Sequence, residues 1–301
     1  MWPFVMTNTS DALQDPLSEN TRLSPGNSPT GFDSIPGIPG TISSPRKQCD
    51  GGYRHYTIRL YPPERRSIPE RQYPERLLAR HTRLDVLNSV HEAGVVPIFY
   101  NGDFDTARSI VLACRDGGIA AIEFTNRGDH AHEVFSELDR WAAREAPDVI
   151  LGAGSIQDAP TVALYIANGA NFIVSPATDD DTARLCNRRK IAYMPGCGSV
   201  TEIAHAEELG CEIVKLFPGD SVGGPGFVKA TRAPMPWSSI MPTGGVAGSR
   251  DSLKAWFDAG VPAVGMGSAL VSSDIVADGA WNTLSERCRD VLATIKELSG
   301  R

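Results

Sequence analysis

From residue 82 onward, short apolar runs alternate with longer amphipathic stretches, and this alternation restricts the possible folds more than any other feature. Eight of the apolar runs have the length of β-strands. These runs are 95–100, 119–124, 149–154, 171–174, 191–194, 211–219, 239–241 and 263–265. Eight strands that alternate with helices predict an α/β protein with a (β/α)8 TIM barrel. The alternative is a doubly wound open sheet, which the lack of a Gly-x-Gly-x-x-Gly motif after the first strand disfavours.

The stretches between the apolar runs predict helices. An apolar stripe at helical spacing precedes the first strand and consists of Leu84, Val86, Leu87 and Val90. Further helices are predicted at 105–116, 131–144, 158–168, 179–188, 200–209, 226–231, 250–259 and 279–298.

The first 80 residues differ from the rest in composition. They contain half of the 22 prolines, separated mainly by Ser, Asn, Gly and Arg. Such a segment cannot bury enough apolar surface to offset the entropy that it would lose on ordering. We therefore expect a disordered Pro/Ser-rich extension at 1–80 and the barrel at 81–301. Residues 56–61 could form one short strand, for which no partner is evident; the alternative is a docking arm that becomes ordered on a partner.

The composition argues against several classes of protein. A formal net charge of −7 disfavours binding to nucleic acid, and no apolar run reaches the length of a membrane span. The six cysteines include no Cys-x-x-Cys pair and the six histidines no His-Glu-x-x-His pattern, so we expect free thiols in a reducing compartment and no metal site. The first residues lack the charged and apolar regions of a signal peptide, so a cytoplasmic protein is expected.

A lysine stands in the middle of the sixth apolar run. Ile213, Lys215 and Phe217 share one face of this strand, because strand side chains alternate between faces. Parallel barrel strands are apolar on both faces, so a lysine here is unusual. Burial disfavours the charged ammonium, and a neutral amine can form a Schiff base with a ketone. The alternative is a lysine at a strand end that extends to water or pairs with a carboxylate.

Two more charged residues lie at the end of the second strand. Glu123 is part of an apolar run, where a carboxylate is costly unless it is paired or functional. We interpret it as functional, although pairing with Lys215 or Arg127 is an alternative. Arg127 follows the strand and can bind a carboxylate through its forked guanidinium, or it can be an ordinary surface arginine.

The loops after the seventh and eighth strands are rich in glycine. They read Thr243-Gly244-Gly245 and Gly267-Ser268. In barrels these two loops commonly bind phosphate through backbone N–H groups, so a phosphate or carboxylate site is predicted. The alternative is that the glycines form ordinary tight turns.

Together these motifs resemble those of 2-keto-3-deoxy-6-phosphogluconate (KDPG) aldolase, whose family includes 4-hydroxy-2-oxoglutarate (KHG) aldolase. The similarity extends from about Leu84 to the C-terminus, in order and in spacing. The segments that carry it are 123–127, 152–155, 174–176, 194–196, 214–219, 242–246 and 265–268.

The resemblance implies a role for each matching residue. Lys215 would be the Schiff-base lysine and Glu123 the general acid/base. The carboxylate of pyruvate would be held by Arg127 and by Ser155, which stands where the family usually has threonine. Asn126 and Gly128 differ from the commonest forms of the family motif. The other implied substrate-binding residues are Pro97 and Pro176 at the pyruvate pocket, Phe217 against the substrate, and Thr243, Gly244, Gly245 and Ser268 at the distal phosphate or carboxylate.

The resemblance also implies an activity and an assembly. A class I aldolase of this kind would cleave a 2-keto-4-hydroxy acid reversibly to pyruvate and an aldehyde, with no metal or organic cofactor, as a homotrimer. Its partners would be the small-molecule 2-keto acid and pyruvate, with no nucleic acid and no membrane. Two alternatives are another phosphate-binding barrel, such as an isomerase or synthase, and a non-catalytic barrel recruited through its N-terminal arm.

Overall fold

The computed structural model describes residues 41–47, 53–59 and 79–300. The chain divides into two compact units, Met1–Arg71 and Gln72–Arg301. In the first unit, strand β1 (Thr41–Lys47) pairs antiparallel with β2 (Tyr53–Arg59), in a register that runs from Thr41↔Arg59 to Lys47↔Tyr53. The strand expected at 56–61 therefore begins at Tyr53 and has a partner that its sequence does not reveal. The rest of the predicted extension, 1–40, 48–52 and 60–78, lies outside the described residues.

The second unit begins with helix α1 (Arg83–Ala93), which confirms the first predicted helix. Thr82 accepts a hydrogen bond from the Asp85 backbone, and the Asp85 side chain accepts one from the Thr82 backbone, so the helix starts with a capping box. Val86 and Val90 of the predicted stripe are buried. Both pack into the cluster of side chains that point inward from the strands.

All the strand pairs of the second unit are parallel. One hydrogen-bonded sheet has the order β11-β3-β4-β5-β6-β7, and a second has the order β10-β9-β8. An isolated bridge between Thr243 and Gly265 joins β10 to β11. The strands are β3 (Val95–Phe99), β4 (Ala121–Thr125), β5 (Ile150–Gly154), β6 (Phe172–Val174), β7 (Ala192–Met194), β8 (Gly196–Cys197), β9 (Val214–Leu216), β10 (Ile240–Pro242) and β11 (Val264–Met266).

The predicted fifth strand is interrupted rather than continuous. Pro195 separates β7 from β8, since proline has no N–H with which to continue the ladder. The Pro195 carbonyl nevertheless accepts a hydrogen bond of 2.8 Å from the backbone N–H of Lys215. The interruption thus lies beside the lysine strand.

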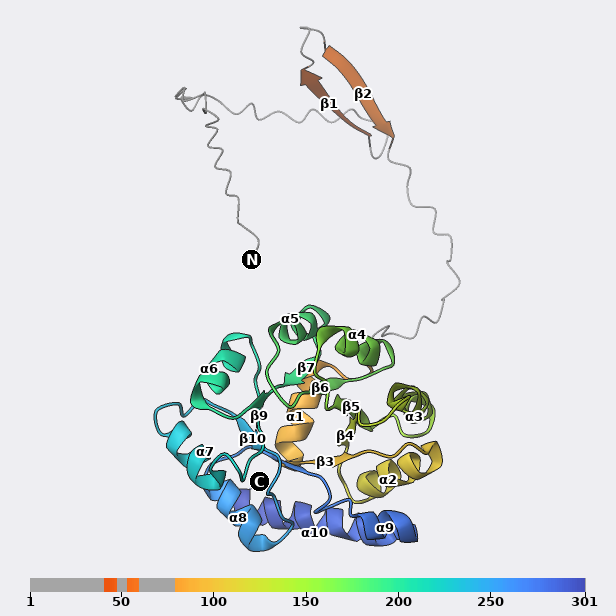
Figure 1. The fold of residues 1–301 in the computed structure, drawn as a ribbon. Helices are drawn as coiled ribbons and strands as arrows, with labels where there is room; N and C mark the ends of the chain where they lie inside the picture. Colours follow the sequence, from red (N-terminus) through yellow and green to blue (C-terminus); the bar gives the residue numbers. More distant parts are fainter. Residues whose placement is uncertain (1–40, 48–52, 60–78, 301) are drawn as a thin grey trace, which may run out of the picture. The chain divides into compact units, whose positions relative to one another are not determined.

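Helices surround the curled parallel sheet, as Figure 1 shows. The predicted helices are all present. Helix α9 is an additional one, and its six residues are too few to give a periodic pattern. A large apolar core fills the space between the helices and the outer faces of the strands. The helices are α2 (Phe104–Asp116), α3 (Ala131–Glu145), α4 (Ala159–Ala167), α5 (Asp180–Arg189), α6 (Val200–Glu208), α7 (Gly224–Arg232), α8 (Arg250–Asp258), α9 (Ser273–Asp278) and α10 (Trp281–Ser299).

Candidate active site

Strand alternation places Lys215 and Glu123 inside the curled sheet. In β4, Ala121 belongs to the inner core, whereas Ile122 and Phe124 belong to the outer core, so Glu123 points inward. The same alternation around β9 directs Lys215 inward. Their side chains are 7% and 1% exposed, for lysine and glutamate respectively, and Lys215 Nζ lies 4.0 Å from Glu123 Oε1.

The Glu123 carboxylate is buried with neither oxygen hydrogen-bonded to another described group. Burial raises the pKa of Glu123, and the positive charges of Lys215 and Arg127 lower it, with burial the larger effect. A buried carboxylate that lacks hydrogen-bond donors is costly to the fold and is typical of a functional site. This carboxylate is therefore available to exchange a proton with a bound molecule.

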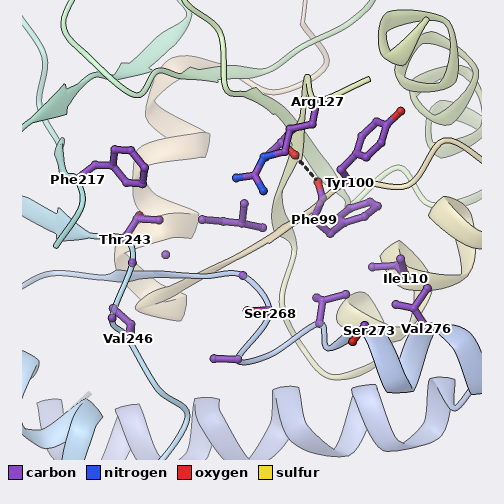
Figure 2. Close-up of a pocket in the computed structure, with 18 of the residues that line it drawn as sticks. Phe99, Tyr100, Ile110, Arg127, Phe217, Thr243, Val246, Ser268, Ser273 and Val276 are labelled. Carbon is purple, nitrogen blue, oxygen red and sulfur yellow. Dashed lines mark hydrogen bonds between the residues drawn. The ribbon is translucent and has the colours of Figure 1, made fainter. Parts of the chain in front are cut away.

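A cavity of about 750 Å³ opens at the ends of the strands, and six of the predicted site residues line it. Figure 2 shows Arg127 with its guanidinium directed into this cavity and Phe217 on the opposite side. The six predicted residues are Arg127, Phe217, Thr243, Gly244, Gly245 and Ser268.

Phe217 links the cavity to the lysine. Lys215 Nζ lies 5.1 Å from the centroid of the Phe217 ring, within the range of a cation–π contact. The ring also lines the cavity wall. A molecule that enters the cavity and contacts Phe217 is thereby brought close to the lysine amine.

The loop after β10 forms another wall of the cavity. Thr243 donates a backbone hydrogen bond of 3.0 Å to Leu216, and its carbonyl accepts one of 2.9 Å from Gly219, so the loop is tied to the end of the lysine strand. Gly244 and Gly245 have φ values of 87° and 78°, which a residue with a Cβ rarely adopts. The wall here is therefore made of backbone, which can approach an anion closely.

Lys215 and Glu123 are not among the residues that line the cavity, and neither are Pro97, Pro176 and Ser155. Pro97 lies within β3 and is paired with Met266. Pro176 follows β6, where its carbonyl packs against Gly196 so tightly that a Cβ on Gly196 would overlap it. Ser155 follows β5 with a φ of 58°, an unusual conformation for a residue other than glycine.

The cavity also contains residues that the sequence did not point to. Tyr100, Ile110 and Val276 line it, and Figure 2 shows the last two near Ser273. Tyr100 and Ile110 were expected only as parts of a strand and a helix, and Val276 belongs to the unpredicted α9. The identity of such a residue within its element carries no local signal that separates a cavity wall from a core.

Within the described part of the chain, no three or more His, Cys, Asp or Glu residues are grouped so that they could hold a metal ion. None of the described helices is long and apolar enough to span a membrane.

Comparison with known proteins gives matches along this second unit. The family model of KDPG and KHG aldolase matches residues 86–287. The chain is 32% identical over 199 residues to the 2-dehydro-3-deoxy-phosphogluconate aldolase of Pseudoalteromonas atlantica. The aligned residues make up 66% of this chain and 90% of that enzyme. The 2-dehydro-3-deoxy-phosphogluconate aldolase of Haemophilus influenzae is 27% identical, and the aligned residues make up 72% of this chain and 99% of that enzyme.

A similar solved structure is the KDPG aldolase of Legionella pneumophila, with pyruvate captured at low pH as a covalent carbinolamine intermediate. It is 26% identical in sequence, with a TM-score of 0.62, and covers 67% of this chain and 96% of that one.

Proposed function

We infer that this chain, which belongs to the KDPG and KHG aldolase family, reversibly cleaves KDPG to pyruvate and glyceraldehyde 3-phosphate. It is a carbon–carbon lyase of the Schiff-base type. Cleavage of KHG to pyruvate and glyoxylate is the related reaction that the same site would perform. The observation that carries the proposal is the pair of buried, inward-pointing side chains, Lys215 and Glu123, whose Nζ and Oε1 atoms are 4.0 Å apart.

In the proposed mechanism Lys215 supplies the electron sink. Its neutral amine adds to the C2 ketone of the substrate, and the adduct takes up a proton and loses water to give a protonated imine. The bond between C3 and C4 then breaks, and its electron pair moves into the imine to form an enamine. The aldehyde leaves as the C4 hydroxyl loses its proton. Protonation of the enamine at C3 and hydrolysis of the imine release pyruvate and restore the amine.

Glu123 is the proposed proton carrier. It would take the proton of the C4 hydroxyl, directly or through water, and later return one to C3 of the enamine. Its burial, its raised pKa and its lack of hydrogen-bond partners among the described groups support this role. A carboxyl with a raised pKa gains and loses a proton more readily near neutrality than an exposed one.

The remaining site residues are proposed to hold the two ends of the substrate. Arg127 would bind the carboxylate next to the ketone, with Ser155 assisting and with Pro97 and Pro176 shaping that end. Phe217 would pack against the carbon chain. The distal phosphate or carboxylate would lie against the backbone wall described above and against Ser268.

Borohydride reduction in the presence of pyruvate tests this function. We expect the wild-type protein to gain the mass of one reduced pyruvate adduct per chain and Lys215→Ala to gain none. Lys229→Ala, which removes an exposed lysine from α7, is the matched control and should be labelled like the wild type. An isomerase, a synthase or a non-catalytic barrel would show no adduct in any of the three.

We also propose the finer features of fold and assembly. The strand pairings and the Thr243–Gly265 bridge support a closed (β/α)8 barrel in which β7 and β8 count as one interrupted strand. A homotrimer in the cytoplasm is proposed from the family resemblance and from the scattered cysteines. Light scattering should give three times the 32.4 kDa chain mass; a mass of one or two chains would contradict the trimer.

A further inference from the structure

Asn126 directly precedes the cavity arginine, and its side chain leads away from the cavity. Its Oδ1 accepts a hydrogen bond of 3.0 Å from the hydroxyl of Tyr165 in α4. Its backbone N–H donates a bond of 2.8 Å to the carbonyl of Gly154 at the end of β5. Asn126 is thus tied both to the neighbouring strand and to a helix outside the sheet.

Tyr165 is itself held rigidly. It is 0% exposed, and its ring packs edge-on against Phe135 at 5.2 Å between centroids. Phe135 in turn contacts Phe124 at 5.9 Å, and Phe124 contacts Tyr100 at 5.7 Å. The phenol therefore sits in an aromatic cluster that packs against the outer face of β4. Burial raises the pKa of Tyr165 to about 12, so it remains a neutral donor at physiological pH.

The Arg127 guanidinium, by contrast, has no fixed partner. Among the described residues it forms no hydrogen bond or ion pair, and the residue is exposed. Its backbone N–H donates a bond of 3.0 Å to Thr125, and the Thr125 hydroxyl donates one of 3.2 Å to the carbonyl of Phe99, which Figure 2 marks with a dashed line. The position from which the arginine side chain extends is thus set by the backbone of this loop.

We propose that Tyr165 is a positioning residue that sets the affinity of the site for the carboxylate of the substrate. Its hydrogen bond to Asn126 holds the backbone of the loop after β4, and this loop directs the Arg127 guanidinium into the cavity. Tyr165 lies in α4 and packs in the core outside the sheet, whereas Lys215 and Glu123 point inward, so Tyr165 does not touch the substrate. The inference rests on the carboxylate-binding role proposed for Arg127. It gives a function to Asn126, one of the two positions at which the motif departs from its commonest form.

The half-saturating pyruvate concentration in borohydride trapping measures this affinity. Tyr165→Phe removes only the hydroxyl and keeps the ring in its aromatic cluster. A neutral hydrogen bond is worth a factor of about 2 to 10 in an equilibrium constant. We expect the half-saturating pyruvate concentration to rise by about that factor, with the trapping rate at saturation unchanged. In KDPG cleavage the same variant should raise KM and leave kcat unchanged.

Variants of Asn126 and Arg127 test whether Tyr165 acts through its hydrogen bond to Asn126 and through Arg127. Asn126→Ala should raise the half-saturating concentration as much as Tyr165→Phe does, and the double variant no more than either alone. In an Arg127→Ala background, Tyr165→Phe should have no further effect. Ser285→Ala is the control, since it removes another buried hydroxyl, which donates a hydrogen bond of 2.9 Å to the carbonyl of Ala113. Ser285 lies far along the sequence from the motif, so this variant should leave the half-saturating concentration unchanged.

Several results would overturn the inference. An unchanged half-saturating concentration in Tyr165→Phe would do so, as would an equal rise in Ser285→Ala, which would indicate general destabilisation. Effects that multiply in the double variant or persist without Arg127 would also overturn it. Absence of any pyruvate adduct in the wild type would refute the proposed function and this inference with it, so the two failures are distinguishable.

Discussion

A methyl group on Gly154 would overlap the side chain of Glu123, the proposed proton carrier. A Cβ built there would stand 2.6 Å from Glu123 Cγ and closer still to the carboxyl group, whereas real Cβ atoms essentially never approach within 3.0 Å. Gly154 lies at the end of β5 without a positive φ, so alanine suits its backbone. The three atoms nearest to the added methyl group in Gly154→Ala all belong to the side chain of Glu123.

The size of the effect follows from the burial of this carboxylate. Glu123 is 1% exposed, so its side chain can move only by displacing packed neighbours. Overpacking of this kind costs about 1–3 kcal/mol, and each kcal/mol lowers Tm by about 2–4 °C in a domain of this size. The carboxylate must shift by about 1 Å, and a misplacement of that order at a reacting group costs about 10²-fold in rate.

Exchange of the pyruvate methyl protons with deuterated water reports this proton transfer. We expect Gly154→Ala to slow exchange by about 10²-fold while still forming the borohydride-reducible adduct. Gly152→Ala is the matched control, because its methyl in the same strand would press on the Phe172 ring instead. It should lower Tm but largely keep the exchange rate. Gly226→Ala, whose methyl would meet nothing within 4 Å, should keep both.

Two outcomes would refute the reasoning. Exchange at the wild-type rate in Gly154→Ala would show that the carboxylate has room to move or is not the proton carrier. An equal loss of exchange in Gly152→Ala would attribute the effect to overpacking of the sheet in general.

The remaining predictions concern Glu123, its charged neighbours and the N-terminal boundary. Glu123→Gln should keep the pyruvate adduct and slow methyl exchange by about 10²–10⁴; unchanged exchange would exclude the role. Because burial raises the pKa of Glu123 above the ordinary 4.5, the base form accumulates only as pH rises through that higher value, and exchange should rise with it. Arg127→Gln removes a charge that lowers this pKa, so the rise should move to higher pH, whereas a fixed profile would contradict the cause assigned. Residues 1–78 should be dispensable, so a chain that starts at Ala79 should keep activity and Tm. A chain that starts at His81 should have a lower Tm, because it loses the 3.0 Å ion pair of Arg80 with the mostly buried Asp139; equal Tm values would show that the pair contributes nothing.

Local sequence patterns located most of the elements and singled out the charged residues that the structure buries. Apolar runs and helical stripes located the strands and helices of the second unit, because each pattern reflects which side of an element is buried. Lys215 and Glu123 were recognisable because a charged side chain in an apolar strand is costly unless it is used. The predictions failed where the local signal is weak. Six residues are too few to show the period of α9, and β1 contains proline and serines that strands disfavour.

The geometry of the site depended on tertiary structure. The sequence directs Lys215 and Glu123 to a face of their own strands, but the 4.0 Å between them results from the curling of the sheet, which the packing of all its strands and helices determines together. The same holds for the hydrogen bond between Asn126 and Tyr165, which joins a loop to a helix elsewhere in the sequence. A periodic pattern specifies how a residue faces within its element, whereas the distance between two elements is a property of the whole packed core.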